Sequence, residues 1–184
     1  EVKVLNLVDP LHSDSWNCMS DLGEDTLMAQ MLTNVIIGNT SSGKGDHFWD
    51  NGEANLLKGL VLYVQTNPDI PPSEKNLATV YEILTSPLLT HFIESVLEDT
   101  RKHPSKASFS LFAQSSDTVR QGIILGLGTR LQVLQDLAVK QLVSCSDIDL
   151  TAPGRHKCAY YIILSDQETS MAFLCSSASP TSLA

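Results

Sequence analysis

The chain has 184 residues, of which 42% are hydrophobic and 18% are charged. This composition supports a packed core and excludes a wholly disordered chain. No apolar run approaches the roughly 18–20 residues that cross a bilayer, so the sequence predicts no membrane span. The four cysteines are too few and too scattered for a disulfide scaffold, which favours a reducing compartment. Residues 1–20 show no targeting segment, and the start at Glu1 suggests an excerpt from a longer protein.

The net charge of −9 is unevenly distributed along the chain. Residues 1–100 carry 15 acidic and 4 basic side chains, whereas residues 101–184 carry 6 acidic and 8 basic ones. A general affinity of the whole chain for phosphate backbones is therefore disfavoured. Any contact with nucleic acid would come from the second half.

The first half of the chain reads as one strand followed by helices. Apolar alternation over residues 2–7 predicts a strand, and turn-forming residues 9–23 predict a long structured loop. Apolar residues at helical spacing then predict a helix over residues 24–37 and a second over about 50–66, ended by Asn67-Pro68. Ser73 or Asn76 can cap a third helix through residue 84.

The second half continues with helices and closes with strands. Ser86-Pro87 predicts the start of a fourth helix that runs to about Lys102, with Pro104 as its stop, and residues 105–114 are ambiguous. Ser115 or Ser116 can cap a helix that continues or restarts through residue 143. Residues 148–150 and 158–164 read as strands, separated by a turn at 152–154.

The order of elements is therefore strand, helical block, strand. Two single strands cannot make a stable sheet by themselves, so they look like parts of a sheet whose other strands are missing. The tail, residues 175–184, has no apolar period and is expected to be disordered or foreign to the fold.

No catalytic, cofactor-binding or metal-binding constellation emerges from the motifs. The segment from Gly38 to Lys44 matches seven positions of a phosphate-binding P-loop, but the eighth is Gly45, which has no hydroxyl for magnesium. The segment also follows a helical pattern, whereas a P-loop follows a strand. The cysteines and histidines lack zinc spacing, and no G-x-S-x-G elbow is present.

Three further features have both a structural and a functional interpretation. Gly122, Gly126 and Gly128 lie in a helical pattern and predict close helix-on-helix approach. Glu53 lies on an apolar stripe and is either a buried carboxylate with a partner or an edge residue that reaches water. The basic cluster at residues 101–103 and 106 either contacts nucleic acid or complements the macrodipole at a helix C-terminus.

Several segments, read in order, resemble the TraG-like coupling proteins of conjugative type IV secretion, which are DNA-transfer ATPases. The segments are KVLNLVDPLHSDSWN (3–17), IIGNTSSGKGDHFWDNGEANLLKGLVLYV (36–64), NLATVYEILT (76–85) and SDIDLTAPGRHKCAYYIILSDQETSMAFL (146–174). The resemblance covers about residues 3–174 and implies a mainly α chain: an all-α domain inserted in a RecA-like α/β motor. It places residues 1–23 and 145–174 in the motor and residues 24–144 in the all-α domain.

The resemblance also implies where the motor chemistry would lie. The ATP-binding P-loop is expected upstream of Glu1, and the magnesium-binding acidic strand downstream of residue 174. This chain is then not expected to be an enzyme or to bind ATP or magnesium itself. The intact protein is expected to be a hexamer anchored in the membrane with this domain on the cytoplasmic face, and the present chain a soluble monomer or weak dimer. After Leu174 the sequence departs from the family pattern, which continues there as an apolar helix.

The charge pattern and the resemblance leave two candidate functions, one of DNA recognition and one of protein docking. In the first, the helical domain recognises single- or double-stranded DNA and the relaxase bound to it, and delivers both to the secretion channel. No family motif identifies contact residues, but charge suggests Arg101, Lys102, Lys106, Arg120 and Arg130. In the second, the acidic first half docks basic secretion signals or relaxosome accessory proteins without DNA contact.

Overall fold

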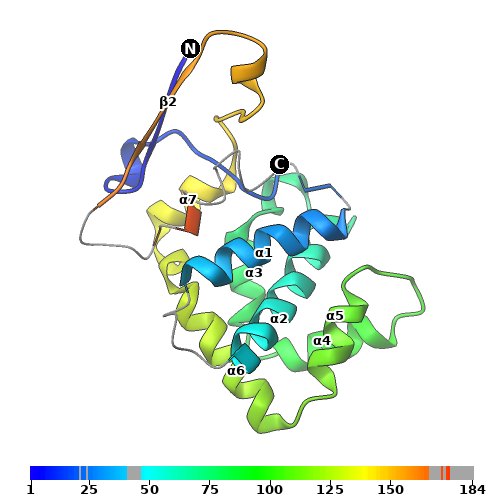
Figure 1. Ribbon diagram of the computed structural model, residues 1–184. Coiled ribbons are helices and arrows are strands. Elements are labelled where there is room, and N and C mark those ends of the chain that lie inside the picture. The colour runs from blue at the N-terminus through cyan, green and yellow to red at the C-terminus, as the bar shows by residue number, and fades with distance from the viewer. Residues whose placement is uncertain (21, 24, 41–46, 166–170, 172, 175–184) are drawn as a thin grey trace.

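The computed structural model describes residues 1–20, 22–23, 25–40, 47–165, 171 and 173–174. Within this part of the chain the structure is mainly helical, with one two-stranded sheet at one end (Figure 1). In chain order its helices and strands are β1 (Val2–Asn6), α1 (Thr26–Thr40), α2 (His47–Thr66), α3 (Leu77–Leu84), α4 (Leu89–Glu98), α5 (Lys106–Ala113), α6 (Asp117–Arg130), α7 (Leu137–Ser144) and β2 (Ala159–Ile163).

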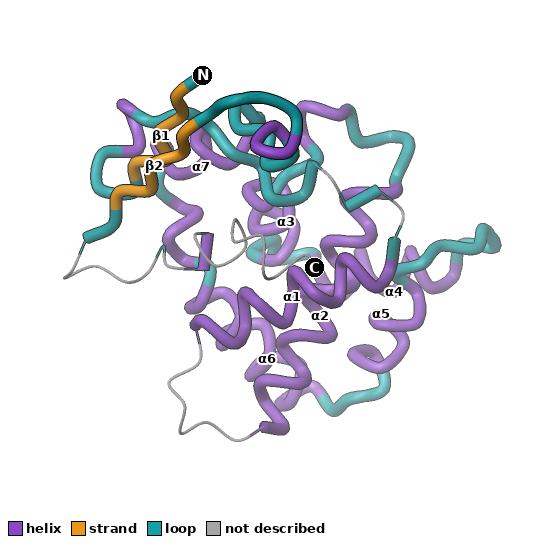
Figure 2. Tube along the Cα trace, turned by 45° about the horizontal axis from the view of Figure 1, so that its top comes forward, coloured by secondary structure: helices purple, strands orange, loops and turns teal. Residues whose placement is uncertain are grey.

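Helix α2 is the centre of the helical body. It packs against α1, α3, α5 and α6, and Figure 2 shows it among these helices, away from the sheet. Most of its predicted apolar stripe is buried: Leu56, Leu57, Leu60 and Val64 are all fully inaccessible to solvent, whereas Trp49, the first member of the stripe, is 38% exposed. A helix that touches four others buries more than one face, which explains why Val61 and Leu62 are also buried.

Two polar side chains start helices in the way that the sequence suggests, and Asp136 is a further cap that it did not predict. The Asn76 side chain accepts a hydrogen bond from the Thr79 N–H and caps α3, and Ser116 accepts one from Val119 and caps α6. Helix α6 ends at Arg130, and α7 restarts after the Asp136 cap, so the second of the two predicted possibilities is confirmed. The ambiguous residues 105–114 form α5.

The predicted end of the fourth helix and one predicted strand are wrong. Helix α4 ends at Glu98 and does not reach Lys102, because Asp99 adopts an extended backbone and its carboxylate accepts hydrogen bonds from Arg101 instead. Residues 148–150 form no strand, because the Asp149 carboxylate accepts from the Thr151 N–H and hydroxyl and folds this segment into a turn. The predicted tail, residues 175–184, lies outside the described residues.

The predicted strands at the two ends of the helical block pair with each other. β1 and β2 are parallel, with Val2 opposite Ala159 and Asn6 opposite Ile163. Much of the apolar surface of β2 is open: Tyr161 is 59% exposed, and Ile162 and Ile163 are nearly half exposed. Parallel sheets are usually covered on both faces, so this sheet is incomplete by the standard of known folds.

Long-range contacts tie the sheet to the helical body. The backbone of Trp16, in the loop after β1, donates to the Leu142 carbonyl of α7 at 2.8 Å, and the Asn17 amide donates to the Lys75 carbonyl at 2.8 Å. Leu5 of β1 and Phe173 belong to the same buried cluster as the helices. The sheet therefore shares one continuous core with the helical block.

The predicted close approach of helices through glycines is confirmed at two of three positions. A Cβ added at Gly122 would lie 2.7 Å from the Trp49 ring, and one added at Gly126 would collide with the Glu53 carboxylate. A Cβ at Gly128 would meet nothing within 4 Å. Gly122 and Gly126 therefore let α6 lie directly against α2, and Gly128 has no such role.

Candidate functional site

The basic cluster of the sequence lies on the loop between α4 and α5 and on the first residue of α5, and we call residues 99–106 the basic loop. Its Asp99 carboxylate accepts from the Arg101 backbone N–H at 2.9 Å and from Arg101 Nε at 2.8 Å. These hydrogen bonds hold the pKa of Asp99 below its usual range. The loop is thus shaped by its own side chains, and Arg101 and Lys102 both remain exposed.

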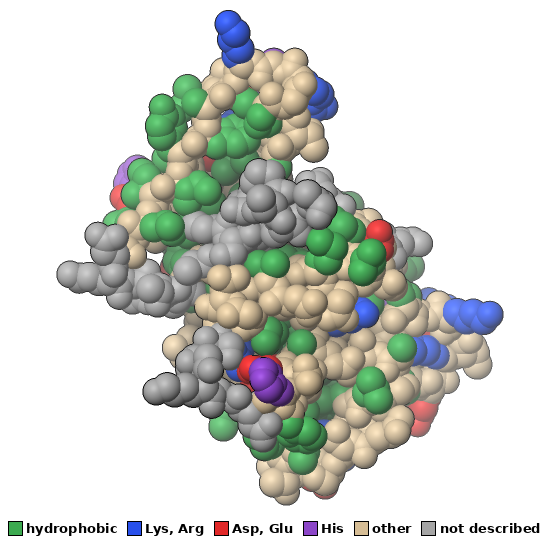
Figure 3. Space-filling model, in the orientation of Figure 1, with side chains coloured by type: hydrophobic (Ala, Val, Ile, Leu, Met, Phe, Trp, Pro, Cys, Tyr) green, Lys and Arg blue, Asp and Glu red, His purple; other side chains and the backbone are tan. Residues whose placement is uncertain are grey.

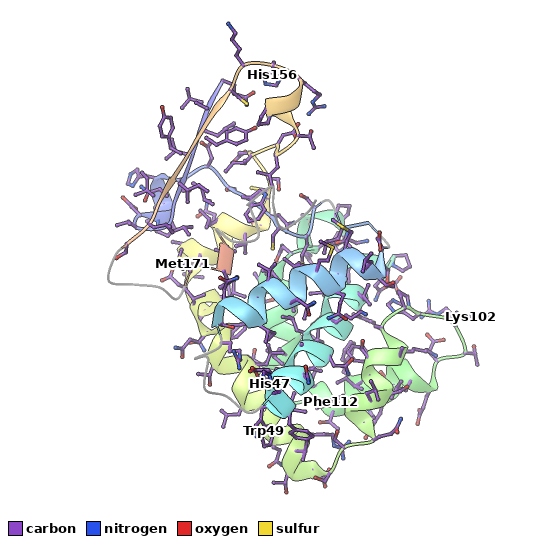
Figure 4. All side chains as sticks on the ribbon, in the orientation of Figure 1. His47, Trp49, Lys102, Phe112, His156 and Met171 are labelled. Carbon is purple, nitrogen blue, oxygen red and sulfur yellow. The ribbon has the colours of Figure 1, made fainter. Side chains whose placement is uncertain are left out.

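Lys106 has a different role from its two neighbours. Its ammonium donates to the carbonyls of Leu97 and Asp99, where the last turn of α4 leaves acceptors without helical partners. The interpretation as a helix C-terminal charge therefore holds for Lys106. Lys102 lies at the outer edge of the basic loop (Figure 4) and, within the described residues, makes no ion pair or hydrogen bond.

His103 fastens the basic loop to the end of α2. The Thr66 hydroxyl donates to the Leu62 carbonyl, so it accepts from His103 Nε2, 3.1 Å away. His103 Nδ1 then accepts from the Ser105 N–H at 3.3 Å, and it lies 2.8 Å from the Ser105 hydroxyl. Both nitrogens are used in the neutral form of the ring. Burial, followed by the nearby charges of Arg101 and Lys106, lowers the pKa of His103 below its ordinary value.

A pocket of about 530 Å³ opens between the C-terminal end of α2 and the basic loop. The Tyr63 ring stands on one of its walls, 5.3 Å from the His103 ring between centroids. Asp69 and Asp99 also line the pocket, and their carboxylates reduce the positive charge at its rim. Its lining comprises Tyr63, Thr66, Asn67, Pro68, Asp69, Ser95, Val96, Asp99, Arg101, Lys102, His103, Pro104 and Lys106.

The other two suggested contact residues lie away from this pocket. Arg120 pairs with Asp117 one turn earlier on α6. Arg130, whose side chain is 16% exposed, binds the carboxylates of Glu53 and Asp50 and also approaches the Ile37 carbonyl. Glu53 is 4% exposed, so it is the buried carboxylate with a partner that the sequence left as one of two possibilities. Of the five suggested contact residues, the structure brings together only Arg101, Lys102 and Lys106.

The space-filling view agrees with this distribution. Figure 3 shows Lys and Arg side chains gathered at the edge where the α4–α5 loop protrudes, with further ones at the opposite end near the N-terminus. In Figure 4 His156 lies at that opposite end, beyond the sheet. The loop there carries Arg155, paired with Asp149, and exposed Lys157.

The segment from Gly38 to Lys44, which resembles a P-loop, begins inside a helix and not after a strand. Gly38 lies inside α1, and the segment from residue 41 to Lys44 lies outside the described residues. A P-loop opens a helix after a strand, so the position of Gly38 argues against a nucleotide site there. Among the residues that the structure describes, no group of three or more His, Cys, Asp or Glu side chains is placed to hold a metal ion.

The comparison with protein families identifies the chain. The family model for type IV secretory system conjugative DNA transfer matches residues 1–175. The chain belongs to this conjugative DNA transfer family. The match extends over both strands and the whole helical block, as the resemblance implied. Neither the curated proteins nor the solved structures include a match.

No helix in the described ranges is both long enough and apolar enough to cross a bilayer. This includes α2, which at 20 residues is the longest helix of the described chain but carries Asp50, Glu53 and Lys58.

Sequence reasoning found the basic cluster, which it placed at a helix end, but missed the α2 side of the pocket. Tyr63 and Asp69 precede Arg101 by more than thirty residues, and no spacing rule joins them. Tyr63 belongs to the apolar run Leu60 to Val64, where an aromatic residue reads as core. The one available signal was the Asn67-Pro68 stop, which predicts a helix end and therefore an exposed loop beside Tyr63.

Proposed function

We propose that this chain is the substrate-recognition domain of a conjugative coupling protein and that its basic loop contacts the DNA being transferred. The observation that carries the proposal is the placement of Arg101 and Lys102. Both are exposed, adjacent, and held on a loop that Asp99, His103 and Lys106 fasten to the helical body. Exposed cations on a fixed loop can neutralise neighbouring phosphates.

The chain's acidity limits how strong this contact can be. With two phosphates neutralised, the logarithm of the affinity for single strands should fall with the logarithm of the salt concentration at a slope of about −1.4. Raising the salt from about 50 to about 200 mM should then weaken binding about sevenfold. Membership of the conjugative DNA transfer family supports DNA as the ligand. The small expected slope corresponds to a weak contact, from which a DNA strand can dissociate readily.

The double variant Arg101→Ala/Lys102→Ala is expected to lose most of this binding and most of the salt dependence. Fluorescence anisotropy of a labelled oligonucleotide, titrated at both salt concentrations, measures both effects. The matched control is Arg155→Ala/Lys157→Ala, which removes the same charge, including an arginine that also pairs with an aspartate.

The control should bind like the parent protein if the basic loop is the contact. Equal loss in both variants would show a diffuse charge effect and contradict the proposal. Absence of binding by the parent protein would favour the second function, in which the acidic half docks basic secretion signals or relaxosome accessory proteins, and a pull-down with the relaxase would follow.

We also propose that the β1–β2 sheet is part of a larger RecA-like motor, with the helices α1 to α7 inserted between its strands. The parallel pairing across more than 150 residues and the exposed apolar face of β2 support this. ATP binding and hydrolysis would then depend on other parts of that motor, and this chain would supply recognition. Titration with ATP tests this directly, since tight binding by the chain alone would contradict it.

Amide hydrogen exchange tests the proposal that the β1–β2 sheet is one part of a larger sheet. Two-stranded sheets are marginal, so the amides of Tyr161 and Ile163 should exchange much faster in this chain than the amides of α2. In a longer polypeptide that carries the rest of the motor, the same amides should become protected while α2 stays unchanged. Protection of β2 equal to that of α2 in the present chain would contradict the account.

A further inference from the structure

The pocket beside the basic loop has features that phosphate binding does not use. Its volume of about 530 Å³ falls within the range of small-molecule sites. Its walls carry two aromatic rings, Tyr63 and His103, and a carboxylate, Asp69. Aromatic rings next to a basic rim are the arrangement with which proteins bind unpaired nucleic acid strands, because bases stack on the rings while the rim holds the backbone.

We propose that this pocket accepts one unstacked nucleobase of a single-stranded DNA, with the neighbouring phosphates on Arg101 and Lys102. The inference rests on the proposed function and adds to it a base-binding site. It makes this domain prefer single strands over duplexes.

The aromatic wall is fixed before any ligand arrives. Both nitrogens of His103 are engaged, with Thr66 and with Ser105, which sets the plane of its ring. Tyr63 is also held by an edge contact with Phe92, 4.8 Å between ring centroids. A base that enters therefore meets rings that lose little further freedom on binding, which favours affinity.

Polar groups in the pocket suit the edge of a base. Tyr63 and Asp69 both line the pocket, and within the described residues the Tyr63 hydroxyl and the Asp69 carboxylate have no hydrogen-bond partner, although both interact electrostatically with Arg101. A carboxylate accepts hydrogen bonds from the amino groups of bases, and a phenol can donate or accept. In a duplex these edges are paired and stacked, so duplex DNA could reach only the basic rim.

The first test compares an oligonucleotide of mixed sequence with an abasic oligonucleotide of the same length, which has the same phosphates. Base stacking contributes about 1–3 kcal/mol per base, so the abasic strand should bind about tenfold more weakly, with an unchanged salt dependence. Duplex DNA of the same sequence should resemble the abasic strand. Equal affinity for the intact and abasic strands would overturn the base pocket but leave the phosphate contact standing.

The second test changes the pocket wall. Tyr63→Leu keeps an apolar side chain against Phe92 but removes the stacking ring, and it should bind the intact strand about tenfold more weakly without changing its affinity for the abasic strand. Tyr63→Phe keeps the ring and should stay within about threefold of the parent protein. A thermal melt of each variant shows whether it is folded.

The outcomes separate the two proposals. Loss of binding to both strands in Tyr63→Leu, with an unchanged melt, would overturn the base pocket, because the change should leave phosphate contacts intact. Failure of the parent protein to bind any DNA would overturn the pocket and the proposed function together.

Discussion

Replacing Arg130 by alanine is expected to lower the free energy of unfolding by about 3–5 kcal/mol near pH 7, because it leaves a buried carboxylate without its counter-charge. Arg130 Nε lies 2.5 Å from Glu53 Oε2, and its guanidinium also binds Asp50. Glu53 is only 4% exposed, so its carboxylate depends on Arg130 more than a surface carboxylate would. Denaturation by urea measures the loss.

The pH dependence of this loss identifies its cause. Burial raises the pKa of Glu53 above its ordinary 4.5, and Arg130 opposes that shift, so removing Arg130 raises the pKa further. A carboxyl whose pKa is raised by folding favours the folded state below its unfolded pKa, and this benefit disappears as the pH rises through its folded pKa. The loss in Arg130→Ala should therefore shrink as the pH falls from about 7 toward 4.5.

A double-mutant cycle with Glu53→Gln provides the control. The glutamine is uncharged at every pH, so in this background Arg130→Ala should cost markedly less and the cost should depend little on pH. An equal cost of Arg130→Ala in the parent protein and in the Glu53→Gln background would show that Arg130 does not stabilise the fold through Glu53 and would contradict the account.

Replacing Gly126 by alanine is expected to lower the free energy of unfolding by about 1–3 kcal/mol, against the usual rule that alanine stabilises helices. The new methyl group would collide with the Glu53 carboxylate, which Arg130 holds in place. The Glu53 carboxylate would have to move, which disturbs its ion pair with Arg130 or separates α2 from α6. Thermal and urea unfolding both measure this change.

Gly128 supplies the matched control on the same helix. Its added methyl group would meet nothing within 4 Å, so Gly128→Ala should stabilise the protein by up to about 1 kcal/mol through helix propensity. The effect of Gly122→Ala on the free energy of unfolding should lie between those of Gly126→Ala and Gly128→Ala, because the partly exposed Trp49 ring can move aside. If Gly126→Ala were as stabilising as Gly128→Ala, the close contact of α2 with α6 would be wrong.

The sequence predicted helices well where polar caps and apolar stripes agreed. Asn76 and Ser116 are such caps, and α2 has such a stripe. Prediction failed where a side chain competes with the regular backbone pattern. Asp99 stops α4 early and Asp149 turns a strand-like segment, and both do so through hydrogen bonds to residues two positions ahead. Such local competition has little signature in hydrophobic periodicity.

The basic side of the candidate site could be predicted from the sequence, whereas the aromatic side on α2 could not, because only the first depends on local sequence. Exposed cations show in the charge pattern, so Arg101 and Lys102 were found from the sequence. Charge alone also selected Arg130, because nothing local reveals that Glu53, 77 residues earlier, binds it. Tyr63 and Asp69 join the pocket only through the packing of α2 beside the basic loop, which is a long-range property of the fold.

Photocrosslinking tests the central claim, that the basic loop touches DNA, most directly. A photoreactive phenylalanine analogue at Thr100, which is exposed beside Arg101 and leaves both cations in place, is compared with the same analogue at Leu137, which is 81% exposed at the start of α7, away from the α4–α5 loop (Figure 1). We expect a crosslink to single-stranded DNA at position 100 that falls as salt is raised, and only background at position 137. Equal yields at both positions, or none at 100, would contradict the proposed contact.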